Sequence, residues 1–152
     1  MKVNDSGVVI RKMTREDAQA VAELDKACFA NPWSVGSFEY EAAENPLADY
    51  LVAQGGDGSI VGYAGIWNII DEGHITNVAV RTDFRRKGIA EKMIAELIAR
   101  SSASGVARFT LEVRVSNEPA QKVYRKFGFT EAGYRRRFYE DNGEDAIIMW
   151  KE

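Results

Sequence analysis

The fold is decided by residues 76–100, which read TNVAVRTDFRRKGIAEKMIAELIAR. A strand-like run over residues 76–80 leads into a basic glycine turn, RRKGIA, at residues 85–90. After the turn, apolar residues recur at the spacing of an amphipathic helix; they are Ile89, Met93, Ile94, Leu97 and Ile98. We therefore predict a strand, a turn and a long helix that ends near Ser104, with Gly105 as its C-cap.

The basic turn is predicted to bind a phosphate group. Backbone N–H groups near residues 88–90 lie at a helix N-terminus, where they lack intrahelical partners and the helix dipole favours an anion. Gly88 lets the backbone approach a pyrophosphate closely, and Arg85, Arg86 and Lys87 add positive charge beside it. Neither a Walker loop nor a dinucleotide fingerprint matches the turn. The alternative is a basic turn that only joins a buried strand to a packed helix.

Length and composition favour one compact intracellular domain. The chain has 152 residues, about one domain, and its 45% hydrophobic content is enough for a sizeable core. A single cysteine, Cys28, cannot form a disulfide within the chain, which fits a reducing cytosol. The polar residues 1–6 begin no signal peptide, and no apolar run approaches the roughly 20 residues that cross a bilayer. A formal charge of −3 argues against general nucleic-acid binding. We therefore expect a cytoplasmic protein without a membrane partner.

The whole chain, residues 1–152, is predicted to be a single α/β domain of mixed α+β order. Thr14 and Asp17 form a capping pair before the first helix, and Ser34 is the predicted N-cap of a second helix. A glycine-rich turn at residues 55–58 predicts a hairpin. Strands are expected at residues 8–13, 49–54, 60–70, 73–80, 108–115, 130–139 and 145–151, and further helices at residues 89–104 and 118–127.

A second informative stretch begins at residue 111 and reads LEVRVSN. Because apolar and polar residues alternate along it, Glu112 is predicted to lie on the strand face opposite the apolar side chains. In the following helix, Tyr124 lies on the apolar stripe. From the residues alone, Glu112 is interpreted as a solvated carboxylate and Tyr124 as a core aromatic.

Together these motifs resemble those of the GNAT superfamily of N-acetyltransferases, and in particular the ribosomal-protein-alanine N-acetyltransferases of the RimI type. The similarity runs almost end to end. Two departures from the family pattern are Ala90, where a glycine is usual, and Phe138, where a tyrosine is common. The motifs that carry the resemblance are at residues 31–34, 78–91, 111–114, 116–117, 124, 135–139 and 144–149.

The resemblance implies a GNAT fold, with a mixed, mostly antiparallel sheet of about six to seven strands flanked by about four helices. It also implies that acetyl-coenzyme A is the co-substrate. Glu112 would be the general base and Tyr124 the general acid, while Trp33, Arg136 and Tyr139 would line the acceptor groove. The implied cofactor-binding residues are Val78, Ala79, Val80, Arg85, Arg86, Lys87, Gly88, Ile89, Ala90, Glu91 and Asn117.

The implied reaction is acetyl transfer to the N-terminal α-amine of a protein, namely a small-subunit ribosomal protein that begins with Ala. An α-amine has a pKa of about 7.7 to 8.0 against about 10.4 for lysine, so its neutral form costs about 3.4 kcal/mol less to make. The backbone N–H near Val80 is a candidate donor to the oxyanion, because a strand end can expose an unpaired amide. The alternatives are an acetyltransferase of small amines or lysine side chains, and a noncatalytic module that binds acyl-coenzyme A or the ribosome.

Two other reactive side chains, Cys28 and His74, are interpreted as structural or surface residues. Cys28 lies on an apolar helix stripe and is interpreted as core. His74 lacks neighbours at metal-ligand spacing, so we predict a structural or surface histidine and no metal. The arginines at residues 135–137 alternate along an expected strand and would face peptide, RNA or solvent. We hypothesise that the acidic residues Asp141, Glu144 and Asp145 attract a basic N-terminal tail of the acceptor.

Overall fold

The structure is a computed structural model that describes residues 2–3 and 7–152. Over these residues one sheet of eight strands has the order β1-β2-β3-β4-β5-β6-β8-β7, and only the β5–β6 pair is parallel. The strands are β1 Lys2–Val3, β2 Val9–Lys12, β3 Ala48–Gln54, β4 Ile60–Ile69, β5 Glu72–Val80, β6 Arg108–Arg114, β7 Thr130–Arg135 and β8 Ala146–Lys151. Apart from the two-residue β1, the sheet therefore has the seven strands and the antiparallel character that were expected.

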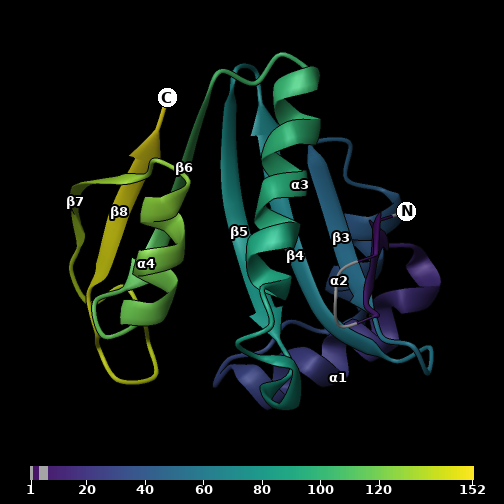
Figure 1. Cartoon of the computed structure of the whole chain (residues 1–152). Coiled ribbons are helices and arrows are strands. Elements are labelled where there is room, and N and C mark those ends of the chain that lie inside the picture. Colours follow the sequence, from purple (N-terminus) through teal and green to yellow (C-terminus); the bar gives the residue numbers. More distant parts are fainter. Residues whose placement is uncertain (1, 4–6) are drawn as a thin grey trace.

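Helices cover both faces of this sheet, as Figure 1 shows. Helices α3 (Ile89–Ala103) and α4 (Glu118–Lys126) lie on the near face, and α1 (Ala18–Cys28) and α2 (Val35–Ala43) lie behind it. Two short 3-10 helices, Arg15–Asp17 and Thr82–Phe84, complete the regular structure. The predicted caps are present: the Thr14 N–H donates to Asp17 Oδ2, and the Ser37 N–H donates to Ser34 Oγ.

Each face of the sheet has its own hydrophobic core. The larger core joins α3 and α4 to the sheet and includes Met93, Leu97, Leu111 and Phe129. The smaller core joins α1 and α2 to the other face and includes Phe38, Tyr50 and Tyr63. Alternation along β6 explains the division, because its apolar residues all turn toward α3 and α4 while Glu112 turns to the opposite face.

The expected strand at residues 130–139 is wrong at its C-terminal end, because β7 stops at Arg135. Arg137 has φ +52°, a left-handed conformation that a strand cannot contain. The Arg137 N–H donates to Asp145 Oδ1, so the chain turns out of the sheet here and returns at Ala146. The arginines at 136 and 137 therefore belong to a loop.

No helix among the described residues is long and apolar enough to cross a membrane.

Candidate active site

The sheet opens between β5 and β6. These parallel strands pair only at their starts, over Glu72–His74 and Arg108–Thr110. Beyond His74, β5 continues to Val80 with β4 as its partner, and β6 continues to Arg114 with β8 as its partner. Between the two diverging ends, each strand therefore presents a backbone edge without a neighbouring strand.

The hydrogen-bond pattern shows which groups face this opening. Arg81 N–H donates to the carbonyl of Val61 on the β4 side at 2.7 Å. Because backbone groups alternate in direction along an antiparallel ladder, Val78 and Val80 turn their N–H and C=O groups away from β4, toward the opening. On the other side, the Val115 N–H donates to the Asp145 carbonyl in the ladder between β6 and β8. By the same alternation, Glu112 turns its backbone N–H and C=O groups away from β8, toward the opening.

A cradle of free amides closes one end of the opening. Among the described residues, no group accepts a hydrogen bond from the N–H of residues 86–91; the first amide of α3 with a partner is that of Lys92, which donates to Gly88. Gly88 is the N-cap and has φ +75°, and Arg86 is also left-handed at φ +62°. Consecutive free amides at the N-terminus of a 15-residue helix form a site for an anion.

The side chains of the turn contribute unequally to this cradle. Arg86, Lys87 and Gly88 are exposed, whereas the Ile89 side chain is buried in the core and can offer a ligand only its N–H. Arg85, predicted as a phosphate ligand, donates instead through Nε to the Val80 carbonyl at 3.0 Å. Glu91 forms a 3.1 Å ion pair with Lys126, which ties α3 to α4.

Glu112 lies between two basic side chains at the other end of the opening. His74 Nε2 donates to Glu112 Oε1 at 2.7 Å, and Arg135 Nε donates to Oε2 at 3.4 Å. The hydrogen bond from His74 is the main reason that the pKa of Glu112 lies below its ordinary range; partial burial acts in the opposite direction. The interpretation of Glu112 as a solvated carboxylate is therefore wrong, since only 12% of its side chain is exposed.

The sequence did not predict His74 as a site residue, although it holds the Glu112 carboxylate. It stands opposite Thr110 in the last parallel pair, and Glu112 follows two residues later on the same face of β6. Only the register between β5 and β6 brings the imidazole to the carboxylate. Its ring also packs edge-on against Trp67, with centroids 6.3 Å apart.

Tyr124 is buried, as predicted, and packs edge-on against Phe129 in the larger core. Its hydroxyl has no hydrogen-bond partner among the described residues. Burial raises the pKa of this phenol far above its ordinary value. The side chain is therefore a hydrogen-bond donor at any working pH, with its donor position unused.

Tyr139 lies under the guanidinium of Arg114, which is 3.9 Å from its ring centroid. Burial raises the pKa of Tyr139 to about 12, and the charge of Glu112 acts in the same direction. Arg114 also pairs with Asp141 at 3.0 Å and Glu144 at 3.2 Å. Because one guanidinium pairs with both carboxylates, Arg114 offsets part of the negative charge of the acidic cluster and weakens its attraction for a basic acceptor.

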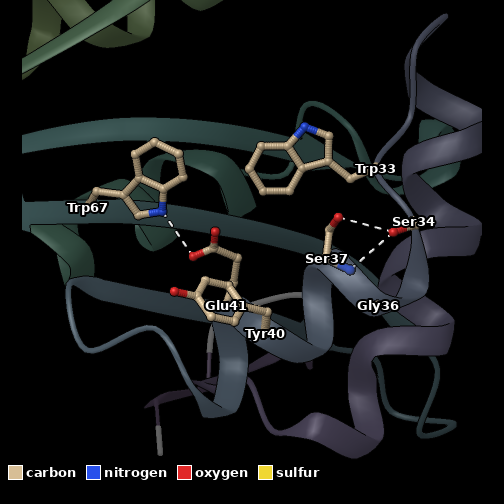
Figure 2. Close-up of a pocket in the computed structure, with 7 residues that line it drawn as sticks. All are labelled: Trp33, Ser34, Gly36, Ser37, Tyr40, Glu41 and Trp67. Carbon is tan, nitrogen blue, oxygen red and sulfur yellow. Dashed lines mark hydrogen bonds between the residues drawn. The ribbon is translucent and has the colours of Figure 1, made fainter.

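Trp33 lies in the loop between α1 and α2. The backbone N–H of Trp33 donates to the buried Asp25 carboxylate, which also accepts from the Tyr63 hydroxyl. The Trp33 indole stacks on Trp67, with centroids 6.4 Å apart, and both rings line a shallow pocket of about 560 Å³ (Figure 2). Contacts from Trp33 through Trp67 to His74 thus connect the pocket with Glu112.

The remaining predicted residues play smaller parts. Asn117 is the N-cap of α4, where its side-chain oxygen accepts from the Ala120 N–H at 3.2 Å. Arg136 is exposed and forms no ion pair with the described residues. Cys28 is half-buried, with Sγ 3.8 Å from an Arg85 nitrogen. Among the residues that the structure describes, no group of three or more His, Cys, Asp or Glu side chains could hold a metal.

Residues 18–129 match the model of the acetyltransferase (GNAT) family. The chain belongs to this family. A relative in Bacillus subtilis (strain 168), named as a putative [ribosomal protein bS18]-alanine N-acetyltransferase, is 43% identical over 141 residues, which cover 93% of each chain. The resemblance to this group of GNAT proteins is confirmed.

Solved structures of GNAT proteins agree with the fold. The crystal structure of the ribosomal-protein-S18-alanine N-acetyltransferase from Escherichia coli superposes with a TM-score of 0.85 and 31% identity, covering 95% of this chain and 92% of that one. A NatC complex bound to Gag peptide and CoA has a TM-score of 0.83 and covers 95% and 97% of the two chains. At 24% identity, the NatC complex shows the fold alone. The expected GNAT fold is confirmed.

Proposed function

We propose that the protein transfers an acetyl group from acetyl-coenzyme A to the N-terminal α-amine of a protein, and that its acceptor is a small-subunit ribosomal protein. One observation carries the proposal: a largely buried carboxylate and a cradle of free amides lie along the same opening between β5 and β6. The similarity to relatives named as acetyltransferases of a ribosomal protein supports the choice of acceptor.

The co-substrate would lie along the opening. Its pyrophosphate would accept hydrogen bonds from the amides of residues 86–91, with Arg86 and Lys87 adding charge. An extended chain that contains amide groups can pair with an unpartnered strand edge, and Val78 and the N–H of Val80 offer backbone groups for this, whereas the Val80 carbonyl accepts from Arg85. The Val80 N–H is then the donor nearest the strand end and our candidate for the oxyanion.

Glu112 would accept the proton that the amine loses. An α-amine of pKa about 7.7 to 8.0 is roughly a quarter to two-fifths neutral at pH 7.5, so attack on the thioester carbonyl needs no strong base. As the carbon–nitrogen bond forms, the nitrogen becomes positive and strongly acidic. The Glu112 carboxylate, held in place by His74, takes this proton directly or through a water molecule and passes it to solvent.

Tyr124 would donate a hydrogen bond to the sulfur as the carbon–sulfur bond breaks. Because burial raises the pKa of the phenol, full proton transfer to a thiolate of pKa about 8.5 is uphill. Stabilisation of the leaving thiolate by a hydrogen bond is therefore the role that fits the residue, and the thiolate receives its proton from solvent.

The proposal is tested with purified protein, acetyl-coenzyme A and synthetic peptides that begin with Ala, Ser, Thr or Met, each with an internal lysine. Mass spectrometry of fragment ions locates any acetyl group. We expect acetylation of the α-amine, fastest for Ala. Modification of lysine alone would support a lysine acetyltransferase, and tight cofactor binding without transfer to any amine would support a noncatalytic module.

A further inference from the structure

A carboxylate lies at the base of the pocket between the two tryptophans. Glu41, on α2, is 8% exposed, and its Oε2 accepts hydrogen bonds from Trp67 Nε1 and Asn45 Nδ2, both at 2.9 Å. Its other oxygen, Oε1, has no partner among the described residues. Figure 2 shows this oxygen turned toward the space between Trp67 and Trp33.

The lining of the pocket favours a cation. Glu41 is the only charged side chain among the residues that line it, and Trp33, Trp67 and Tyr40 supply aromatic rings around the carboxylate. Aromatic rings attract cations through their electron-rich faces, and a buried carboxylate with an unused oxygen adds charge and a hydrogen-bond acceptor. Burying this oxygen under an apolar group would leave it unsatisfied, which costs free energy.

The pocket lies beside the proposed catalytic carboxylate. Trp67 pairs with His74 across β4 and β5, and His74 contacts Glu112. These contacts place the pocket wall on the order of 10 Å from Glu112, the length of about three extended residues. A chain whose α-amine reaches Glu112 is therefore long enough to bring the side chain of one of its next residues to the pocket.

We propose that this pocket binds a basic side chain, arginine or lysine, of the acceptor polypeptide just after its N-terminal residue. The inference rests on the proposed function and adds a determinant of acceptor choice to it. Glu41 pairs with the guanidinium or ammonium group, and the indoles of Trp33 and Trp67 cover its apolar stem.

The test uses peptides that begin with Ala and carry one arginine at the second, third or fourth residue. Each has a partner peptide with citrulline, which keeps the shape of arginine without its charge. KM and kcat are measured for the wild type, Glu41→Gln and Glu39→Gln. Glu39 lies on the same helix outside the pocket, so its variant loses the same charge and controls for general electrostatic attraction.

We expect the arginine peptide to have an about tenfold lower KM than its citrulline partner at one position, in the wild type and in Glu39→Gln. In Glu41→Gln this difference should vanish. Gln retains an oxygen for Trp67 and Asn45, so the variant should fold, which thermal unfolding checks. Trp33→Leu, which keeps Glu41 but removes one ring, should reduce the preference partly.

An equal KM for both peptides in the wild type, or a preference that persists in Glu41→Gln, would overturn the subsite while α-amine transfer stands. Binding is followed separately by tryptophan fluorescence, without acetyl-coenzyme A. If no α-amine is acetylated, the proposed function fails, and the fluorescence titration still decides whether Glu41 distinguishes arginine from citrulline.

Discussion

The Glu112 carboxylate contacts His74 and Arg135, and the proposed proton transfer depends on it. We expect Glu112→Gln to lower kcat by about 10²- to 10⁴-fold, the usual contribution of a general base. Its affinity for acetyl-coenzyme A should stay the same, because the amides of residues 86–91 are unchanged. Steady-state kinetics and calorimetric titration measure the two quantities, and a variant with wild-type kcat would remove the base from the mechanism.

His74 should set the protonation of Glu112. Because the imidazole donates to the carboxylate and lowers its pKa, His74→Phe should raise the pKa of Glu112 toward or above its ordinary value. Arg135→Gln should raise it less, since Arg135 is farther away at 3.4 Å. Carbon-13 NMR titration of the glutamate carboxyl groups, assigned with Glu112→Gln, measures both shifts.

The same pKa links Glu112 to stability. A carboxylate with a lowered pKa in the folded state stabilises the fold fully above its unfolded pKa, and this contribution is lost as the pH falls through the lower, folded pKa. The wild type should therefore lose its stability advantage over His74→Phe only in acid, below about pH 4.3. An advantage that persisted undiminished far below this pH would contradict the assignment.

Side chains could be predicted where they follow from local pattern. The alternation of β6 gave the orientation of Glu112, and helical periodicity gave the burial of Tyr124. The contact between His74 and Glu112 depends instead on the register of two strands, 38 residues apart in the chain. Likewise, nothing in the sequence of the turn shows that Arg85 bonds the Val80 carbonyl.

At the scale of elements, the N-terminus of α3 should bind the co-substrate through its backbone. Gly88 has φ +75° and open space around it, and Gly105, after the other end of the same helix, has φ +99° and is equally open. An alanine at either position strains the backbone by about 1–2 kcal/mol. We therefore expect Gly88→Ala and Gly105→Ala to lower the melting temperature similarly.

Only Gly88→Ala should also weaken the binding of coenzyme A, because relief of its strain would move the amides of the cradle. Calorimetric titration of both variants tests this. Equal dissociation constants for the two variants would mean that the turn joins strand and helix without binding phosphate, the alternative that the sequence left open.

Most element boundaries could be predicted because their signals are local. The caps at Thr14 and Ser34 and the glycines after α3 and α4 mark helix ends within a few residues. The end of β7 was misplaced, because the side chains at residues 135–139 continue to look like a strand. The turn there depends on the Asp145 carboxylate, which accepts from the Arg137 N–H across the loop.

At the scale of the whole molecule, the opening between β5 and β6 divides the sheet into two parts (Figure 1). A ligand that fills the opening bridges both parts and should stabilise the fold. At 100 times its Kd, acetyl-coenzyme A should add about 2.7 kcal/mol to the free energy of unfolding, about 5–11 °C in melting temperature for a domain of this size. ATP at the same concentration, which offers phosphates but no pantetheine, should give a much smaller shift. Equal shifts would place the ligand on the turn alone.

The central claim, acetyl transfer to an α-amine at Glu112, is tested most directly on an intact acceptor. A small-subunit ribosomal protein of the kind named for the relatives is incubated with acetyl-coenzyme A and either the wild type or Glu112→Gln, and its mass is followed by top-down mass spectrometry. The account predicts one added acetyl group, on the N-terminal residue, with the wild type and almost none with the variant. Acetyl groups on lysine side chains only, or equal N-terminal acetylation by both proteins, would contradict it.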